Sequence, residues 1–328
     1  QWHMPLFFLL AGMSAWFALA RRSAAEFRKK RLSRLFVPLL FGMLLIVPIQ
    51  VFVERISGFV TTRQSPIDFD GTFFEWWPNT FQCCYPDANL SWHHLWFLLY
   101  LFVYSVLLVG LFKWWRNDGE ASRQRITGFL SRGWNLLVPA LYLGAAEAAL
   151  RPSFPNNQDL VTDLANHANY PVVFALGFLL VSDPRIDAAI DRLWTRALPI
   201  GLAFIALPDI SANVDPATRG IAEWCVLIGL VGLGRRVWTR RIGWIERFSA
   251  ISLPFYIWHQ TVIVVIAYFV IQWDLSAWLM YPVIALPAFA MISEVIPVFS
   301  RRPIYGYAFV AGTSAVIVLL SYTVWAHH

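Results

Sequence analysis

The chain has 328 residues, of which 58% are hydrophobic and only 14% charged, and its formal net charge is +6. Soluble domains carry roughly 25% charged residues, so this composition excludes a soluble globular enzyme, a disordered chain and a secreted disulfide scaffold. The 17 Trp, 26 Phe and 11 Tyr fit a polytopic membrane protein, because aromatic rings gather where lipid meets water.

A membrane-spanning helix needs about 20 mostly apolar residues, and the sequence offers ten stretches of roughly that kind. We therefore predict an all-α, polytopic integral membrane helical bundle with about ten transmembrane helices, formed by residues 1–328 as a single domain. The predicted spans are 4–20, 35–53, 95–112, 133–150, 169–183, 197–211, 219–234, 249–272, 278–298 and 305–325.

The basic residues alternate between the loops that separate these spans. Seven lie in 21–34, two in 54–94, five in 113–132, one in 151–168, three in 184–196, none in 212–218 and five in 235–248. Because positive charge accumulates on cytoplasmic loops, we expect the basic loops in the cytoplasm and the chain in the inner membrane. The excess charge is thus explained by topology, so nucleic acid is not an expected partner.

The strongest candidate for chemistry within a span is His259. It lies 12 residues beyond Arg247, or about 18 Å along a helix, which places it near the middle of the membrane. Ser252 and Tyr256 precede it at helical spacing, so all three are expected on one face. Two interpretations stay open: an acid–base or substrate-orienting histidine, or a histidine that hydrogen-bonds a neighbouring helix.

A second candidate is the histidine pair in Ser91-Trp92-His93-His94-Leu95-Trp96, at the outer mouth of the third span. His93 or His94 could bind or activate an acceptor hydroxyl near the outer surface. The same residues also suit an interfacial belt without catalytic role. Adjacent side chains diverge on a helix and no third ligand is evident, so we predict no metal site.

A third candidate is the arginine cluster, formed by Arg28, Arg31 and Arg34 in the loop 21–34. These side chains follow helical spacing and could bind phosphate groups, or they could simply anchor the loop in the cytoplasm. Acidic residues near the ends of spans are weaker candidates that could pair with arginine or line a pathway; they are Glu147, Asp209, Glu223 and Glu294. Gly12 and Ser14 suggest close helix packing.

Four segments together resemble the membrane-bound acyltransferase family 3. They are FFLLAG at residues 7–12, the arginine cluster before Val37-Pro38, HLWFL at residues 94–98, and the S-x-x-x-Y-x-x-H pattern formed by Ser252, Tyr256 and His259. Within the family, the sequence resembles the glucans biosynthesis protein C subgroup.

This resemblance implies transfer of an acyl group from cytoplasmic acyl-CoA, such as acetyl-CoA or succinyl-CoA, to a hydroxyl of an extracytoplasmic glycan or other acceptor. The candidate catalytic residues are His94, Ser252, Tyr256 and His259, with His259 as a supporting group rather than the principal base, and the arginine cluster is the candidate for donor binding. Family members usually begin with a further helix that bears an Arg and the presumed catalytic base, a His. This chain starts at the second helix, so we expect a truncated sequence whose principal base lies upstream of Gln1.

Two other functions remain open on the sequence. A transporter or flippase for a glycan or lipid-linked sugar would use the polar face at Ser252, Tyr256 and His259 as a path. An inactive scaffold would result if the first helix were truly lost.

Overall fold

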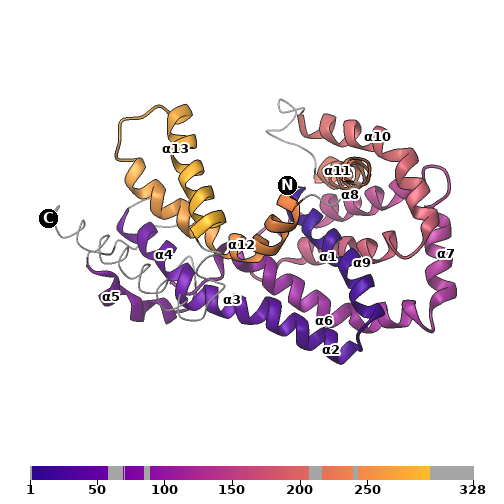
Figure 1. Ribbon diagram of the computed structural model, residues 1–328, viewed down its shortest axis with the longest axis horizontal. Coiled ribbons are helices and arrows are strands. Elements are labelled where there is room, and N and C mark those ends of the chain that lie inside the picture. Colours follow the sequence, from indigo (N-terminus) through magenta and orange to yellow (C-terminus); the bar gives the residue numbers. More distant parts are fainter. Residues whose placement is uncertain are drawn as a thin grey trace. The chain divides into compact units, whose positions relative to one another are not determined.

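The computed structural model describes residues 2–57, 69, 71–84, 89–206, 216–238 and 243–295, and these ranges contain helices and no strand. The prediction of an all-α protein is therefore confirmed for the described part. The chain divides into two compact units (Figure 1). The first unit is made of residues 1–35 and 97–240, and the second of residues 36–96 and 241–328.

Most of the long helices belong to the first unit. Its helices are α1 (His3–Ala20), α2 (Ala24–Arg31), α6 (Trp96–Arg116), α7 (Glu120–Leu130), α8 (Val138–Leu150), α9 (Leu164–Leu180), α10 (Pro184–Ala206) and α11 (Pro216–Val237). In this unit α11 lies between α10 and α8, and α1 packs along α9 (Figure 1).

The second unit contains α3 (Val37–Phe41), α4 (Val47–Ile56), α5 (Phe73–Trp76), α12 (Gly243–Val270) and α13 (Ala277–Ala290). Shorter turns connect or extend the helices of both units. They are the π-helical turns η1 (Leu32–Phe36), η2 (Gly42–Ile46) and η7 (Met291–Val295), and the 3₁₀ turns η3 (Trp77–Phe81) and η4 (His93–Leu95). A further 3₁₀ turn, η5 (Asn135–Leu137), precedes α8 in the first unit.

Six helices of the described part are long and apolar enough to cross a membrane. They are His3–Ala20, Ala24–Ile56, His93–Arg116, Pro216–Val237, Phe248–Val270 and Ala277–Glu294. Two more of the predicted spans appear as shorter apolar helices, Asn135–Leu150 and Leu164–Leu180. The predicted span 305–325 lies outside the described residues, so the count of ten stays a prediction.

Two of the predicted loops are wrong. Residues 184–196 form no loop but the first half of α10, because charged side chains on one face of a helix look like a loop when only hydropathy is read. Residues 24–34 likewise belong to a helix that runs on through Ile56. The Ser23 side chain accepts a hydrogen bond from the Glu26 amide and Glu26 bonds back, which begins this helix with a capping box.

The long helix Ala24–Ile56 contains two π-helical turns, and each is followed directly by a Val-Pro pair, Val37-Pro38 or Val47-Pro48. Proline lacks the amide hydrogen that would bond the carbonyl four residues earlier, and its ring presses against that carbonyl. A π turn widens the helix locally. The prolines therefore explain why this otherwise continuous helix departs from regular spacing.

Glycines set the closest helix contacts in the first unit. A Cβ added at Gly12 of α1 would lie 2.0 Å from the carbonyl oxygen of Phe174, and one at Gly177 of α9 would lie 2.1 Å from that of Leu9. Helices pack this tightly only where side chains are small. The predicted packing role is therefore confirmed for Gly12, whereas Ser14 is exposed and bonds the Ala11 carbonyl of its own helix.

Basic side chains gather at one end of the first unit. At the end of α11, Arg235 Nη1 lies 2.6 Å from Asp187 Oδ1, near the start of α10. The end of α6 meets the end of α1, where Lys113 Nζ donates to the Leu19 carbonyl at 3.3 Å and Arg116 Nη1 to the Trp16 carbonyl at 3.2 Å. The opposite ends of α1, α10 and α11 line a cavity, described below.

Candidate active site

In the second unit, His94 lies against the middle of α12. Its Nε2 lies 3.0 Å from the carbonyl oxygen of Ile257, and the Tyr256 hydroxyl donates to the main-chain carbonyl of His94. The His94 and His259 rings are 5.0 Å apart between centroids and nearly perpendicular, at 82°. The structure therefore brings together His94 and the Tyr256–His259 pair, which the sequence proposed from two separate segments.

Hydrogen bonding fixes which nitrogen of each ring carries its proton. A carbonyl oxygen can only accept, so His94 must donate from Nε2 to Ile257, which leaves Nδ1 with a lone pair. This Nδ1 is buried and has no hydrogen-bond partner among the described residues. His259 Nδ1 lies 2.7 Å from the Tyr256 carbonyl and donates to it, which leaves Nε2 with the lone pair. Both rings thus present a basic nitrogen.

A neutral imidazole with a free lone pair is the commonest general base in proteins. His94 combines that property with an orientation fixed through its other nitrogen, which is the arrangement in which a base is held ready for proton transfer. The second ring at 5.0 Å offers another acceptor beside it. The histidine pair, His94 and His259, can therefore take up and return a proton.

Ser252 is placed differently from the other predicted site residues. It is exposed, and its hydroxyl donates to the Ser249 carbonyl of α12 at 2.9 Å. It lies on the same helix as Tyr256 and His259, one turn before Tyr256, and it engages its own helix rather than His94.

Gly42 in the π turn η2 keeps space around His94. A Cβ at this position would lie 2.4 Å from Leu95 Cδ1 and 3.6 Å from Ile257 Cγ2. Leu95 follows His94 in the chain, and Ile257 supplies the carbonyl that His94 bonds. A larger residue at Gly42 would therefore push on both sides of the His94 hydrogen bond.

A polar group surrounds the neighbouring His93. Its Nδ1 lies 3.5 Å from Gln50 Nε2, which donates to Glu54 at 2.9 Å. Arg55 Nε donates to the Asn89 side chain at 3.2 Å. His93 also adopts a φ of +39°, a conformation that costs a residue other than glycine about 1–2 kcal/mol. Such strain persists only where neighbouring contacts enforce it.

The arginine cluster lies in the first unit on a helix, not in a loop. Arg28 and Arg34 are exposed, while the half-buried Arg31 places its guanidinium 4.8 Å from the Phe27 ring centroid. Arg28 and Arg31 belong to α2, whereas Arg34 falls in the π turn η1. The regular spacing that the sequence suggested is therefore interrupted before Arg34.

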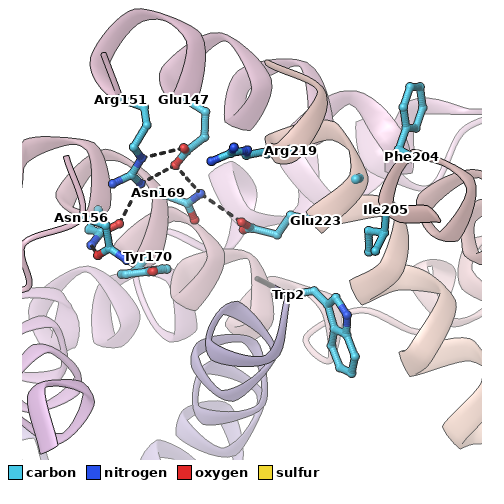
Figure 2. A pocket seen from close by; sticks show the side chains of 12 residues that line it. Trp2, Glu147, Arg151, Asn156, Asn169, Tyr170, Phe204, Ile205, Arg219 and Glu223 are labelled. Carbon is cyan, nitrogen blue, oxygen red and sulfur yellow. Dashed lines mark hydrogen bonds and ion pairs between the residues drawn. The ribbon is translucent and has the colours of Figure 1, made fainter. Parts of the chain in front are cut away.

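The first unit holds a second concentration of polar groups, the polar cavity, with a volume of about 510 Å³. Arg151 Nη2 and Glu147 Oε1 form an ion pair at 2.7 Å. Asn169 Nδ2 donates to Glu147 Oε1 at 3.5 Å and to Glu223 Oε2 at 3.3 Å (Figure 2). Arg219 also lines the cavity (Figure 2). Glu147 and Glu223 were weak candidates in the sequence; Glu294 is exposed, and Asp209 lies outside the described residues.

A buried network beside this cavity escaped the sequence analysis. Tyr100 donates to Asp163 at 2.9 Å, and His167 bonds the Tyr104 hydroxyl at 2.7 Å and the Leu160 carbonyl at 2.9 Å. Because both nitrogens of His167 are bonded, it has no lone pair to offer a substrate. Its role is structural, in contrast to that of His94. No local motif links these residues, since about 60 positions separate the tyrosines from their partners.

Comparison with known proteins identifies the class to which these features belong. The family model described as an acyltransferase domain, acyltransferase family 3, matches residues 1–293. The chain belongs to this family. The match includes residues of both units, and it makes the protein a membrane acyltransferase by family.

Among the curated proteins, cytochrome c oxidase subunits match a short stretch of the chain. Probable cytochrome c oxidase subunit 1-alpha of Streptomyces coelicolor is 59% identical over 46 residues, and its Streptomyces avermitilis counterpart is 61% identical over 46 residues. Each alignment covers 14% of this chain and 8% of the relative, so the chain spans only a small fraction of these proteins. No solved structure matches the chain.

Proposed function

We propose that this member of acyltransferase family 3 is a membrane O-acyltransferase that moves an acyl group from cytoplasmic acyl-CoA to a hydroxyl of an extracytoplasmic glycan. The chain would cross the inner membrane about ten times with its basic loops in the cytoplasm. The observation that carries the proposal is the buried Nδ1 of His94, which has no hydrogen-bond partner within the described ranges, on a ring oriented by Ile257 beside His259.

The proposed topology agrees with the arrangement of the first unit. The starts of α1, α9 and α11 and the ends of α8 and α10 all contribute to one cavity. These five helix ends are the ones that the alternation of basic loops assigns to the outer side. The basic side chains near Leu19, Asp187 and Trp16 lie at the other ends of their helices.

Acyl transfer needs one proton to be moved twice, which suits a histidine. His94 Nδ1 accepts the proton of the acceptor hydroxyl while that oxygen bonds to the thioester carbonyl carbon. This proposal gives His94 the role that the resemblance assigned to a histidine upstream of Gln1. The carbon–sulfur bond then breaks, and the departing CoA thiolate takes the proton from the imidazolium. The products are an ester and CoA with a free thiol. The Tyr256 hydroxyl holds the His94 main chain, and the His259 ring lies beside His94.

The arginine cluster is the proposed contact for the donor. CoA carries several phosphate charges, and exposed guanidinium groups bind phosphate through paired hydrogen bonds. Arg28 and Arg34 are exposed, as that role requires. The acyl group, acetyl or succinyl, is left for experiment.

The test uses inside-out membrane vesicles carrying the full chain, with radiolabelled acetyl-CoA or succinyl-CoA outside and a neutral glucan inside. We expect label to become esterified to the enclosed glucan and free CoA thiol to appear outside in equal amount. Glucan that crosses the membrane unmodified would favour the transporter instead. The absence of both acyl transfer and glucan transport would favour the inactive scaffold. Vesicles without the protein provide the control.

A further inference from the structure

The wall of the polar cavity carries four buried polar atoms without a hydrogen-bond partner among the described residues. They are Glu223 Oε1, Asn169 Oδ1, Arg219 Nε and Arg151 Nη1. Buried polar groups in native proteins are almost always paired. Four such atoms around one cavity therefore indicate groups whose partners arrive with the molecule that fills it.

The open atoms are held in fixed directions. Asn169 turns its amide nitrogen toward Glu147 and Glu223, so its oxygen is the atom left over. Arg151 uses Nε and Nη2 on Glu147, and Nη2 also on the fully buried Asn166, so that Nη1 remains. The cavity wall is thus organised in advance, which lowers the entropic cost of binding.

The combination of open atoms selects the chemistry of the ligand. Two are donors and two are acceptors, and a hydroxyl group is the common ligand group that both donates and accepts. The wall holds as many acidic as basic side chains, two glutamates and two arginines, and this even mixture is better suited to a polar neutral molecule than to a strongly charged one. The other side of the cavity is apolar, with Trp2, Phe204 and Ile205 (Figure 2).

We infer that the polar cavity binds a neutral, polyhydroxylated ring, a sugar unit of the acceptor. The polar wall receives its hydroxyl groups, and the aromatic side chains Trp2, Tyr170 and Phe204 cover its carbon faces. That the sugar is the acyl acceptor rests on the proposed function, in which the acceptor binds on the outer side of the membrane. Sugar binding itself needs no acyl donor and can be measured separately.

The experiment measures sugar binding to the full chain in lipid nanodiscs by isothermal titration calorimetry, with no acyl-CoA present. The probes are glucose and maltotriose as neutral sugars, and inorganic phosphate and phosphoethanolamine as charged alternatives. Arg219→Met removes one open donor while keeping side-chain volume, and Glu223→Gln is the milder second variant. Arg192→Met, at the opposite end of the same unit, is the matched control, since Arg192 bonds only loop carbonyls there in the contacts seen.

We expect a neutral sugar to bind the wild-type chain, Arg219→Met to weaken that binding at least tenfold, Glu223→Gln to weaken it severalfold, and Arg192→Met to change it less than twofold. No heat with either sugar at about 10 mM, ten times a Kd of about 1 mM, would overturn the inference. So would tighter binding of phosphate or phosphoethanolamine, or unchanged sugar binding in both cavity variants.

His94→Gln separates this inference from the proposed function. Because His94 belongs to the other unit, we expect this variant to bind sugar normally while losing acyl transfer. Normal transfer with normal sugar binding would refute the role of His94 and leave the cavity assignment intact. Lost sugar binding in Arg219→Met with normal folding and normal transfer would refute the acceptor role of the cavity.

Discussion

Replacing Gly12 or Gly177 with alanine tests the packing that holds the polar cavity together. The added Cβ would lie 2.0 Å from the Phe174 carbonyl oxygen in the first case and 2.1 Å from the Leu9 carbonyl oxygen in the second. Ordinary contact begins near 3.4 Å. The obstructing atoms belong to the backbone, so they cannot turn aside as a side chain would, and α1 must move away from α9.

Overpacking of this kind costs about 1–3 kcal/mol, and for a unit of this size each kcal/mol lowers Tm by about 2–4 °C. We therefore expect Tm to fall by about 2–12 °C in either variant. The start of α1 supplies Trp2 to the cavity and the start of α9 supplies Asn169 and Tyr170. Sugar binding should consequently weaken together with stability.

Gly110→Ala is the matched control, since nothing lies within 4 Å of a Cβ added at Gly110 on α6. Alanine favours a helix over glycine by up to about 1 kcal/mol, so this variant should melt at or slightly above the wild-type temperature. Thermal unfolding is followed by size-exclusion chromatography of heated, detergent-solubilised protein. If Gly12→Ala and Gly177→Ala melt like Gly110→Ala, the close approach of α1 and α9 is wrong.

Three further predictions follow from the same contacts. Gly42→Leu should lower kcat with little change in donor KM, because its side chain displaces Leu95 beside His94; an unchanged kcat would refute this. Hydrogen bonds from Arg185 hold the pKa of Asp183 well below its usual value, so Asp183 contributes stability above an unfolded-state pKa of about 3.9 and loses it as pH falls further. Asp183→Asn should therefore melt lower than wild type at pH 7, and the gap should narrow below about pH 4; a constant gap would exclude the explanation. Alanine substitutions in the arginine cluster should raise the KM for acyl-CoA about tenfold, whereas the exposed Arg125→Ala should not; equal KM values would remove the cluster from donor binding.

Local sequence signals account for much of the helical architecture. Apolar stretches located six helices that can cross a membrane, and Ser23 and Glu26 form the S-x-x-E pattern that marks a helix start. The same signals failed at α10, where Asp187, Asp191 and Arg192 made the first half resemble a loop. The physical reason is that α10 packs on α11, where Asp187 and Asp191 pair with Arg235. A partner so distant in the sequence cannot be identified from local hydropathy.

The histidine pair was predictable only in part. Each histidine attracted attention in its own segment, but 163 positions separate His94 from Ile257, and only the fold brings them together. The hydrogen-bonding difference between His94 and His167 also depends on tertiary contacts. The polar cavity was harder still, since it draws on five helix ends whose residues share no motif.

The most direct test of the account is the turnover of His94→Gln against His167→Gln, measured as CoA thiol release and glucan ester formation by the folded protein. The account predicts that His94→Gln loses most of its turnover at every pH, because a glutamine amide cannot accept the proton that Nδ1 takes from the acceptor hydroxyl. It predicts that His167→Gln melts at a lower temperature yet turns over normally, because His167 has both nitrogens bonded within the protein. Near-normal turnover in folded His94→Gln would contradict the central claim.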